Sequence, residues 1–137
     1  MKKVIIYTTT TGNTEIMAKA IADGARESGA EVVCSSADSV DPSLVDSADV
    51  LYLGSPAMGD EVLDDPMEDF YVGIEGRLSG KKVAIFGSYD WGDGQWLRDW
   101  ADRIRSAGGT VVNGEGTMCN LAPDDAGVAE CKALGAQ

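Results

Sequence analysis

The 137-residue sequence contains no histidine, and this absence removes whole classes of function. Without histidine the chain has no Ser-His-Asp or Cys-His catalytic arrangement and lacks the most common metal-binding side chain. The three cysteines, Cys34, Cys119 and Cys131, form no CxxC pair. Such cysteines are typical of reduced intracellular thiols rather than of a disulfide framework. We interpret Cys34 and Cys131 as buried small side chains; whether Cys119, in a late loop, lines a ligand site stays open.

Positive charge is scarce, and long apolar runs are absent. Eleven Lys and Arg residues stand against 23 Asp and Glu, which gives a net charge of −12. A strongly acidic protein repels nucleic acid and anionic membranes, so we expect neither as a partner and predict basic partner proteins. No apolar run approaches the roughly 20 residues of a membrane-spanning helix, and the N-terminus has no signal-peptide pattern. We expect a cytoplasmic protein with one domain, residues 1–137.

Strand and helix patterns alternate along the whole chain. Strands are expected at residues 4–7, 31–34, 50–53, 82–86 and from 110, and helices at 13–28, from 42, and at 66–74, 95–107 and 123–134. This alternation predicts an α/β fold, a three-layer, doubly wound parallel sheet of five strands with helices on both faces. Ligands of such sheets bind beyond the carboxyl ends of the strands, where the strand order reverses.

The segment Thr8–Thr14 reads Thr-Thr-Thr-Thr-Gly-Asn-Thr and joins the first strand to the first helix. A helix N-terminus offers free N–H groups and suits a phosphate, which this loop would hold with neutral donors because it has no Lys or Arg. The loop matches neither a Walker A motif nor GxGxxG. Helix capping would explain Thr14 alone. Because Thr9, Thr10 and Thr11 then have no role, we favour phosphate binding.

Two further loops, residues 54–61 and 87–94, follow the third and fourth strands and would meet the first loop at one sheet edge. Trp91 lies among glycines, where an exposed aromatic side chain can stack on a flat ring. The alternative, anchoring the loop to the core, suits Trp96 and Trp100 on the next helix better. For Tyr89 both interpretations stay open.

In the second loop, Met58 could pack against the other face of the same ring, although it could also be a core methionine. Gly59 before Asp60 suggests a peptide that adopts positive φ and can flip. Acidic residues would rim the site, where they disfavour an anionic substrate and steer a basic protein; the simpler interpretation is a solvated face. They are Glu61, Asp64, Asp65, Glu68, Asp69, Asp90 and Asp93.

Together these motifs resemble the flavodoxins, in particular the short-chain anaerobe type. The family pattern Thr/Ser-x-Thr-Gly-Asn-Thr appears at Thr9–Thr14, and the segments Ala57–Glu61 and Gly87–Gly94 are similar to that subgroup. The resemblance covers nearly the whole chain. It implies a sheet of order 2-1-3-4-5, noncovalently bound FMN, and a monomeric low-potential one-electron carrier. Such a carrier replaces ferredoxin between basic redox proteins and is not an enzyme.

The resemblance also implies a role for each motif residue. The FMN phosphate would lie against Thr9, Thr10, Thr11, Gly12, Asn13 and Thr14, and the ribityl chain beside Ser55, Pro56 and Ser88. Trp91 and Met58 would cover the two faces of the isoalloxazine, with Ala57 and Tyr89 nearby. The Gly59–Asp60 peptide would flip its carbonyl toward flavin N5–H, Glu61 would bond the ring's polar edge, and the amides of Asp90 and Gly92 would approach its pyrimidine end.

Apolar stacking groups and nearby carboxylates would destabilise an anionic hydroquinone and lower the potential of the second step, by ~59 mV per ~1.4 kcal/mol. A blue neutral semiquinone is therefore expected during reductive titration. Two positions depart from the subgroup. Asp90 stands where the subgroup has glycine, which matters if that backbone takes positive φ. Thr8 replaces a common tryptophan.

Two other functions are alternatives to the electron carrier. An FMN-dependent reductase of quinones or small electrophiles would need an open pocket over the flavin, whereas Trp91 and Met58 would cover both faces. A response-regulator receiver would need acidic residues at the end of the first strand, and Tyr7-Thr8-Thr9 supplies none. The sequence therefore favours the carrier, with no catalytic residue and no metal site.

Overall fold

A computed structural model describes all 137 residues, and its centre is a parallel sheet. The strands are β1 (Lys2–Tyr7), β2 (Glu31–Ser36), β3 (Val50–Gly54), β6 (Lys82–Tyr89), β7 (Thr110–Val111) and β8 (Thr117–Asn120). Their order is β2-β1-β3-β6-β7, with β8 also paired to β6, and every pairing is parallel. The predicted order 2-1-3-4-5 is confirmed, with the fifth strand in two pieces.

The break in the fifth strand has a local cause at Asn113. The Asn113 amide donates to the Ile85 carbonyl at 2.8 Å and accepts from the Ile85 N–H at 3.2 Å. A side chain thus replaces the backbone partner of β6 between β7 and β8. Gly114 and Gly116, with φ of 67° and 103°, let the chain loop outward there, a conformation that glycine adopts without steric cost.

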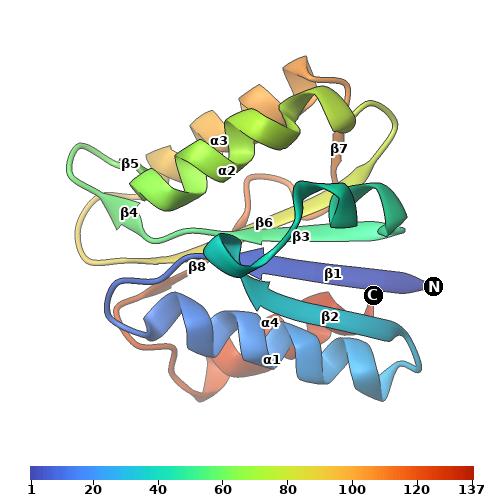
Figure 1. Cartoon of the computed structure of the whole chain (residues 1–137). Helices are drawn as coiled ribbons and strands as arrows, with labels where there is room; N and C mark the ends of the chain where they lie inside the picture. The colour runs from blue at the N-terminus through green and yellow to red at the C-terminus, as the bar shows by residue number, and fades with distance from the viewer.

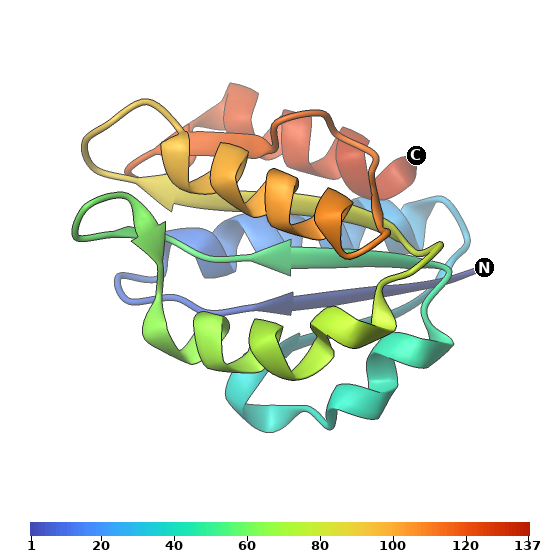
Figure 2. The ribbon, with the colours of Figure 1, turned by 90° about the horizontal axis from the view of Figure 1, so that it is seen from above.

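Four α-helices cover the sheet, two on each face (Figures 1 and 2). α1 (Asn13–Glu27) and α4 (Asp125–Ala136) lie on one face, and α2 (Asp65–Ile74) and α3 (Gln95–Ser106) on the other. The helix predicted from residue 42 is a 3₁₀ turn, η2 (Pro42–Ser47), with two more such turns at η1 (Ala37–Ser39) and η3 (Glu75–Arg77). A small antiparallel hairpin of β4 (Ala57–Met58) and β5 (Val62–Leu63) was not predicted.

Successive side chains of the strands point alternately into two apolar cores. Ile6 and its neighbours pack under α2 and α3, whereas Ile5 packs under α1 and α4, as the two-residue period of a strand requires. Trp96 and Trp100 are each 1% exposed in the first core, so their predicted anchoring role is confirmed. No helix of the chain is long and apolar enough to cross a bilayer.

The C-terminal helix is attached to the sheet by two buried polar side chains. The Lys3 ammonium, on a residue 2% exposed, donates to the carbonyls of Gly135 and Gln137 at 2.6 and 2.7 Å. A cation at the last carbonyls of a helix also opposes the negative end of its dipole. The Tyr52 hydroxyl donates to the Leu134 carbonyl at 3.4 Å. Strands β1 and β3 therefore both hold the end of α4.

Replacement of Tyr52 by phenylalanine is expected to change how stability depends on alkaline pH. Burial raises the pKa of Tyr52 to about 12, above the value of roughly 10 in an unfolded chain. The neutral phenol thus stabilises the fold fully below pH ~10, and this contribution is lost as the pH rises toward ~12. Tyr52→Phe should cost about 1 kcal/mol or less at neutral pH, since its hydrogen bond is long.

Urea unfolding of the wild type and of Tyr52→Phe at several pH values measures this difference. The two free energies of unfolding should meet above pH ~10 and then cross, so that Tyr52→Phe is the more stable protein near pH ~12, because raising the pKa of Tyr52 from 10 to about 12 corresponds to about 2.7 kcal/mol. A difference that stays constant over this range would contradict the expected ionisation.

Candidate functional site

Three loops meet at the carboxyl edge of the sheet, as the sequence predicted. They follow β1, β3 and β6 and lie side by side at the left of both Figure 1 and Figure 2. The reversal of strand order lies between β1 and β3, which is where doubly wound sheets bind their ligands. The β4–β5 hairpin forms most of the middle loop.

The first loop presents unpaired backbone donors. Gly12 occupies the N-cap of α1 with φ of 91°, and no side chain caps the helix. The N–H groups of Asn13, Thr14 and Glu15 form no hydrogen bond within the protein. Capping by Thr14 is therefore not observed, and the three donors point to an anion at the helix start.

The threonines of this loop differ in what they can offer a ligand. Thr10 and Thr11 are exposed, whereas the Thr9 hydroxyl accepts the Gly12 N–H at 3.0 Å and shapes the turn. Thr14 is 1% exposed, and its Oγ1 accepts the Ser88 N–H at 3.3 Å, which joins α1 to β6. The hydroxyl of Thr8 is buried without a partner in the protein. Free amides and several hydroxyls together fit a phosphate.

The middle loop is braced from inside by Ser55. Its hydroxyl donates to the Pro56 carbonyl at 2.9 Å and accepts the Asp64 N–H at 3.0 Å, and its carbonyl accepts the Trp96 indole N–H at 3.0 Å. Ser55 is fully buried and Pro56 is buried too, so the hydroxyl predicted beside the ligand is occupied in holding the loop. Ala57 and Met58 are half-buried.

The hairpin turn contains the backbone conformation predicted for it. Gly59 has φ of 49°, and Gly59 and Asp60 are exposed at the tip. Glu61 also has a positive φ, 57°, which costs free energy for a residue with a side chain. The turn therefore combines a glycine that can rotate cheaply with a strained neighbour.

The carboxylate of Glu61 connects the second and third loops. Its Oε1 accepts the N–H groups of Asp93 at 2.9 Å and Gly94 at 3.2 Å. Gly94 is the N-cap of α3, so a charged acceptor satisfies free donors at a helix start. The family resemblance implies that Glu61 bonds the edge of a bound ring. Its bridge to the 90–94 loop was not predicted, because no local pattern pairs residues so far apart in the chain.

The third loop separates its two aromatic side chains. Trp91 is 61% exposed, so it is free to cover a ligand rather than anchored in the core. Tyr89 packs on Trp96 with ring centroids 5.8 Å apart at 48°, which settles its anchoring role. Asp90 does not take positive φ, so replacing the subgroup's glycine there brings no backbone strain.

Two side chains hold the base of this loop, and one of them was missed in the sequence. The Ser88 hydroxyl donates to the Leu121 carbonyl at 2.6 Å. The Asn120 amide donates to the carbonyls of Tyr89 and Asp90 at 3.2 Å each. Asn120 closes β8, and only the pairing of β8 with β6 brings it to the site.

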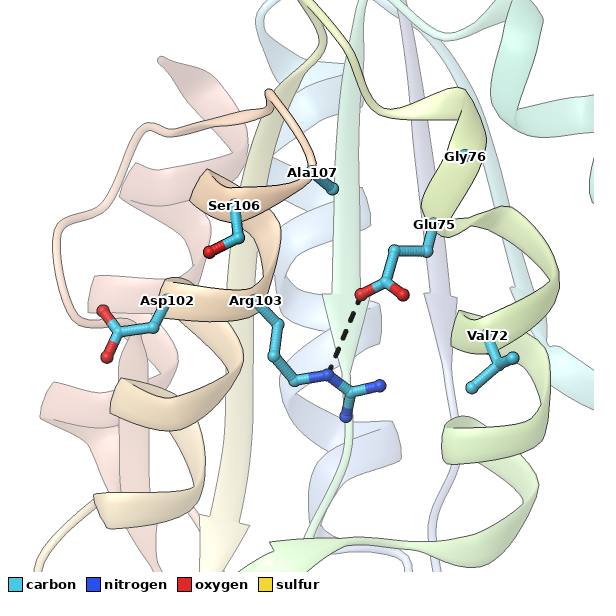
Figure 3. A pocket seen from close by; sticks show the side chains of 7 residues that line it. All are labelled: Val72, Glu75, Gly76, Asp102, Arg103, Ser106 and Ala107. Atoms are coloured by element: carbon cyan, nitrogen blue, oxygen red, sulfur yellow. Dashed lines mark ion pairs between the residues drawn. The ribbon is translucent and has the colours of Figure 1, made fainter.

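The largest cavity, about 670 Å³, lies elsewhere, in a groove between α2 and α3 (Figure 3). Figure 3 shows Arg103 reaching across this groove toward Glu75, 3.9 Å away. The same guanidinium forms two hydrogen bonds to Glu68, at 2.7 and 2.8 Å, which lower the pKa of that carboxyl. Because two carboxylates already pair with Arg103, the groove offers no unpaired positive charge to an anionic ligand, and the loop edge remains the better candidate.

An uncapped helix start that suits a phosphate and an exposed tryptophan beside a hairpin turn lie at one edge of a doubly wound sheet, an arrangement typical of proteins that bind a flavin nucleotide. This is the class of the small electron-transfer flavoproteins. The flavodoxin family model matches residues 5–135. The chain is 43% identical to a flavodoxin of Megasphaera elsdenii over 133 residues, covering 96% of this chain and 93% of the relative. The chain belongs to the flavodoxin family, whose members carry electrons on noncovalently bound FMN.

Other relatives agree with this assignment. A flavodoxin of Clostridium beijerinckii is 48% identical over 109 residues, 79% of each chain. The solution structure of two-electron reduced Megasphaera elsdenii flavodoxin has a TM-score of 0.86 and 40% identity, covering 99% of this chain and 96% of that one. A flavodoxin structure from the domain Archaea has a TM-score of 0.90 at 30% identity, covering 99% and 94%. The predicted resemblance, fold and cofactor are confirmed.

Proposed function

We propose that residues 1–137 act as one monomeric FMN domain that moves single electrons at low potential between cytoplasmic redox proteins, in place of ferredoxin. The observation that carries FMN binding is the start of α1, where three N–H groups have no protein partner and no Lys or Arg stands in the loop. The cytoplasmic location is supported by three cysteines that form no disulfide.

Different loop residues would bind different parts of the cofactor. Thr10, Thr11 and the free amides of α1 would bind the phosphate, while Ser88 and Pro56 support the backbone between the loops. Trp91 and Met58 would cover the flavin ring and exclude water from it. FMN itself, when bound, supplies the electron-accepting ring. The Gly59–Asp60 peptide would present its carbonyl to a ring N–H, since a glycine at φ 49° rotates at little cost.

Acidic residues on the loops at the carboxyl edge of the sheet favour a basic partner. Asp60 and Asp90 are exposed on the loops around the proposed ring site without an ion-pair partner, whereas the exposed Asp93 pairs with Arg98 at 2.7 Å. An acidic rim around an exposed Trp91 would orient a positively charged protein toward the flavin. The same charges make an anionic substrate unsuitable, which supports a carrier over a reductase of small molecules.

A matched pair of glycine variants tests the FMN site. Gly12 and Gly29 have φ of 91° and 89°, and a Cβ at either meets nothing within 4 Å. Alanine at both costs about 1 kcal/mol of backbone strain, but only Gly12 lies at the start of α1. Gly12→Ala is expected to weaken FMN binding about tenfold, whereas Gly29→Ala leaves it unchanged.

Flavin fluorescence titrations of the apoprotein with FMN and with riboflavin measure both affinities. Riboflavin lacks the phosphate, so Gly12→Ala should affect its binding much less than that of FMN. Wild-type protein that takes up no FMN would overturn the proposed function. If both variants lost the same affinity for FMN, or if Gly12→Ala lost the same affinity for FMN and for riboflavin, the first loop would not be the phosphate site.

A further inference from the structure

Two cysteines on different elements, Cys119 and Cys131, lie where the C-terminal helix packs on the sheet. Cys119 lies on β8 rather than in a loop, and it is 8% exposed; Cys131 lies on α4 and is fully buried. Both belong to the core between the sheet and the pair α1 and α4. Cys34, the third thiol, lies on β2, is half-buried and contacts the Ala18 carbonyl.

The Cys119 sulfur points at the face of α4 that carries Cys131. A Cβ built on Gly127 would lie 2.8 Å from the Cys119 Sγ, so this sulfur lies directly over the helix at that position. Cys131 follows Gly127 by four residues and therefore shares its face, one turn further along. The two thiols lie close enough for each to shift the pKa of the other.

The environment makes the two thiols chemically different. A cavity of about 420 Å³ opens beside Cys119, between the end of β8 and the start of α4, and its lining also includes Met118, Asn120 and Gly127. Cys131 has no such access. The neighbouring Cys131 thiol lowers the pKa of the Cys119 thiol, whereas the neighbouring Cys119 and burial raise the pKa of Cys131. Cys119 is thus the accessible nucleophile, and Cys131 lies behind it as the resolving thiol.

We propose that Cys119 and Cys131 form a reversible disulfide between β8 and α4 when the protein meets a low-molecular-weight disulfide such as oxidised glutathione. The Cys119 thiolate attacks one glutathione sulfur, forming a mixed disulfide and releasing one glutathione thiolate. Cys131 then loses its proton and attacks the Cys119 sulfur, releasing the second glutathione. The two protein thiols lose two electrons and two protons, and the glutathione disulfide is reduced to two thiols.

This disulfide needs neither FMN nor a redox partner, so its test is independent of the proposed function. Apoprotein incubated with oxidised glutathione is denatured, and its thiols are counted and its intact mass recorded. The count should fall from the three free cysteines to one, and the mass should show two hydrogens lost without a glutathione adduct. The crosslink should raise the melting temperature by roughly 5 °C, because it restricts the unfolded chain.

Three serine variants identify the attacking cysteine, the resolving cysteine and the cysteine that takes no part. Cys131→Ser should stop at one glutathione attached to Cys119, Cys119→Ser should not react, and Cys34→Ser should form the disulfide as the wild type does. A wild type that keeps all three thiols would overturn the proposal, as would loss of the disulfide in Cys34→Ser. Each serine variant is first shown to be folded by its circular dichroism, so a failure to react is not a failure to fold.

Discussion

Alanine at Gly24 is expected to destabilise the protein by about 3 kcal/mol, whereas alanine at Gly73 should stabilise it by about 0.5 to 1 kcal/mol. A Cβ on Gly24 would lie 2.0 Å from the Lys132 carbonyl oxygen, in the backbone of α4. At Gly73, on the exposed side of α2, a Cβ meets nothing within 4 Å. The same substitution in two helices therefore has opposite signs.

The reason lies in how closely α1 and α4 pack. Gly135 makes the reciprocal contact, since its Cβ would lie 1.9 Å from the Ile21 carbonyl oxygen. Backbone atoms cannot move aside as a flexible side chain can, so α4 must shift as a whole to admit a methyl group at Gly24. Gly135→Ala should cost less than Gly24→Ala, because Gly135 lies near the end of α4, where the helix can fray.

Thermal unfolding of the apoprotein and its variants measures these effects. A loss of about 3 kcal/mol corresponds to a fall of roughly 10 °C in the melting temperature for a domain of this size. FMN binds only the folded state, so an excess of FMN should restore part of the loss in Gly24→Ala. A Gly24→Ala protein as stable as the wild type would show that α1 and α4 separate more easily than their contacts indicate.

The close approach of α1 and α4 illustrates where the sequence stops being informative. The sequence pattern was sufficient to predict the alternation of strands and helices, the common sheet edge of the three loops and the burial of Trp96 and Trp100. It could not show that Gly24 faces the backbone of α4 and Gly135 that of α1, because a glycine within a helix pattern indicates only a weak point of that helix. Contacts between distant segments leave no local pattern.

The same limit applies at the candidate site. The Thr-rich loop and Trp91 were found from residue type and position, since a helix start and an exposed aromatic side chain have recognisable local surroundings. The sequence does not predict that Asn113 splits the fifth strand or that Asn120 bonds the Tyr89 carbonyl, because each side chain reaches a backbone group of another strand. Cys119 was placed in a loop because the second half of the split strand was not recognised.

Removal of the Glu61 side chain should have the largest effect on the candidate site. Glu61→Ala leaves the N–H groups of Asp93 and Gly94 without their carboxylate acceptor. Hydrogen bonds to a charged group contribute about 1.5 to 3 kcal/mol, so the 90–94 loop should lose its attachment to the hairpin. Since Trp91 lies on that loop, we expect FMN affinity to fall about 10-fold to 100-fold and amide exchange at Asp93 and Gly94 to accelerate.

Glu61→Gln distinguishes the effect of the hydrogen bonds to the 90–94 loop from the effect of the negative charge. Glutamine keeps an oxygen that can accept both N–H groups, so the loop should stay attached and most of the FMN affinity should remain. The lost negative charge should instead raise the flavin's reduction potential, because a nearby carboxylate opposes each added electron. Asp23→Asn on α1 removes the same charge far from the loops and should change neither property.

Spectroelectrochemical titration and amide exchange of the three variants decide between two roles for Glu61. If its carboxylate acts mainly by joining the loops, only Glu61→Ala accelerates exchange and releases FMN. If it acts mainly at the ring, as the family resemblance implies, both Glu61 variants raise the potential equally and the exchange of Asp93 and Gly94 does not change. The strained φ of 57° at Glu61 supports the first outcome, because the structure holds this residue in a costly conformation while its carboxylate bridges the two loops.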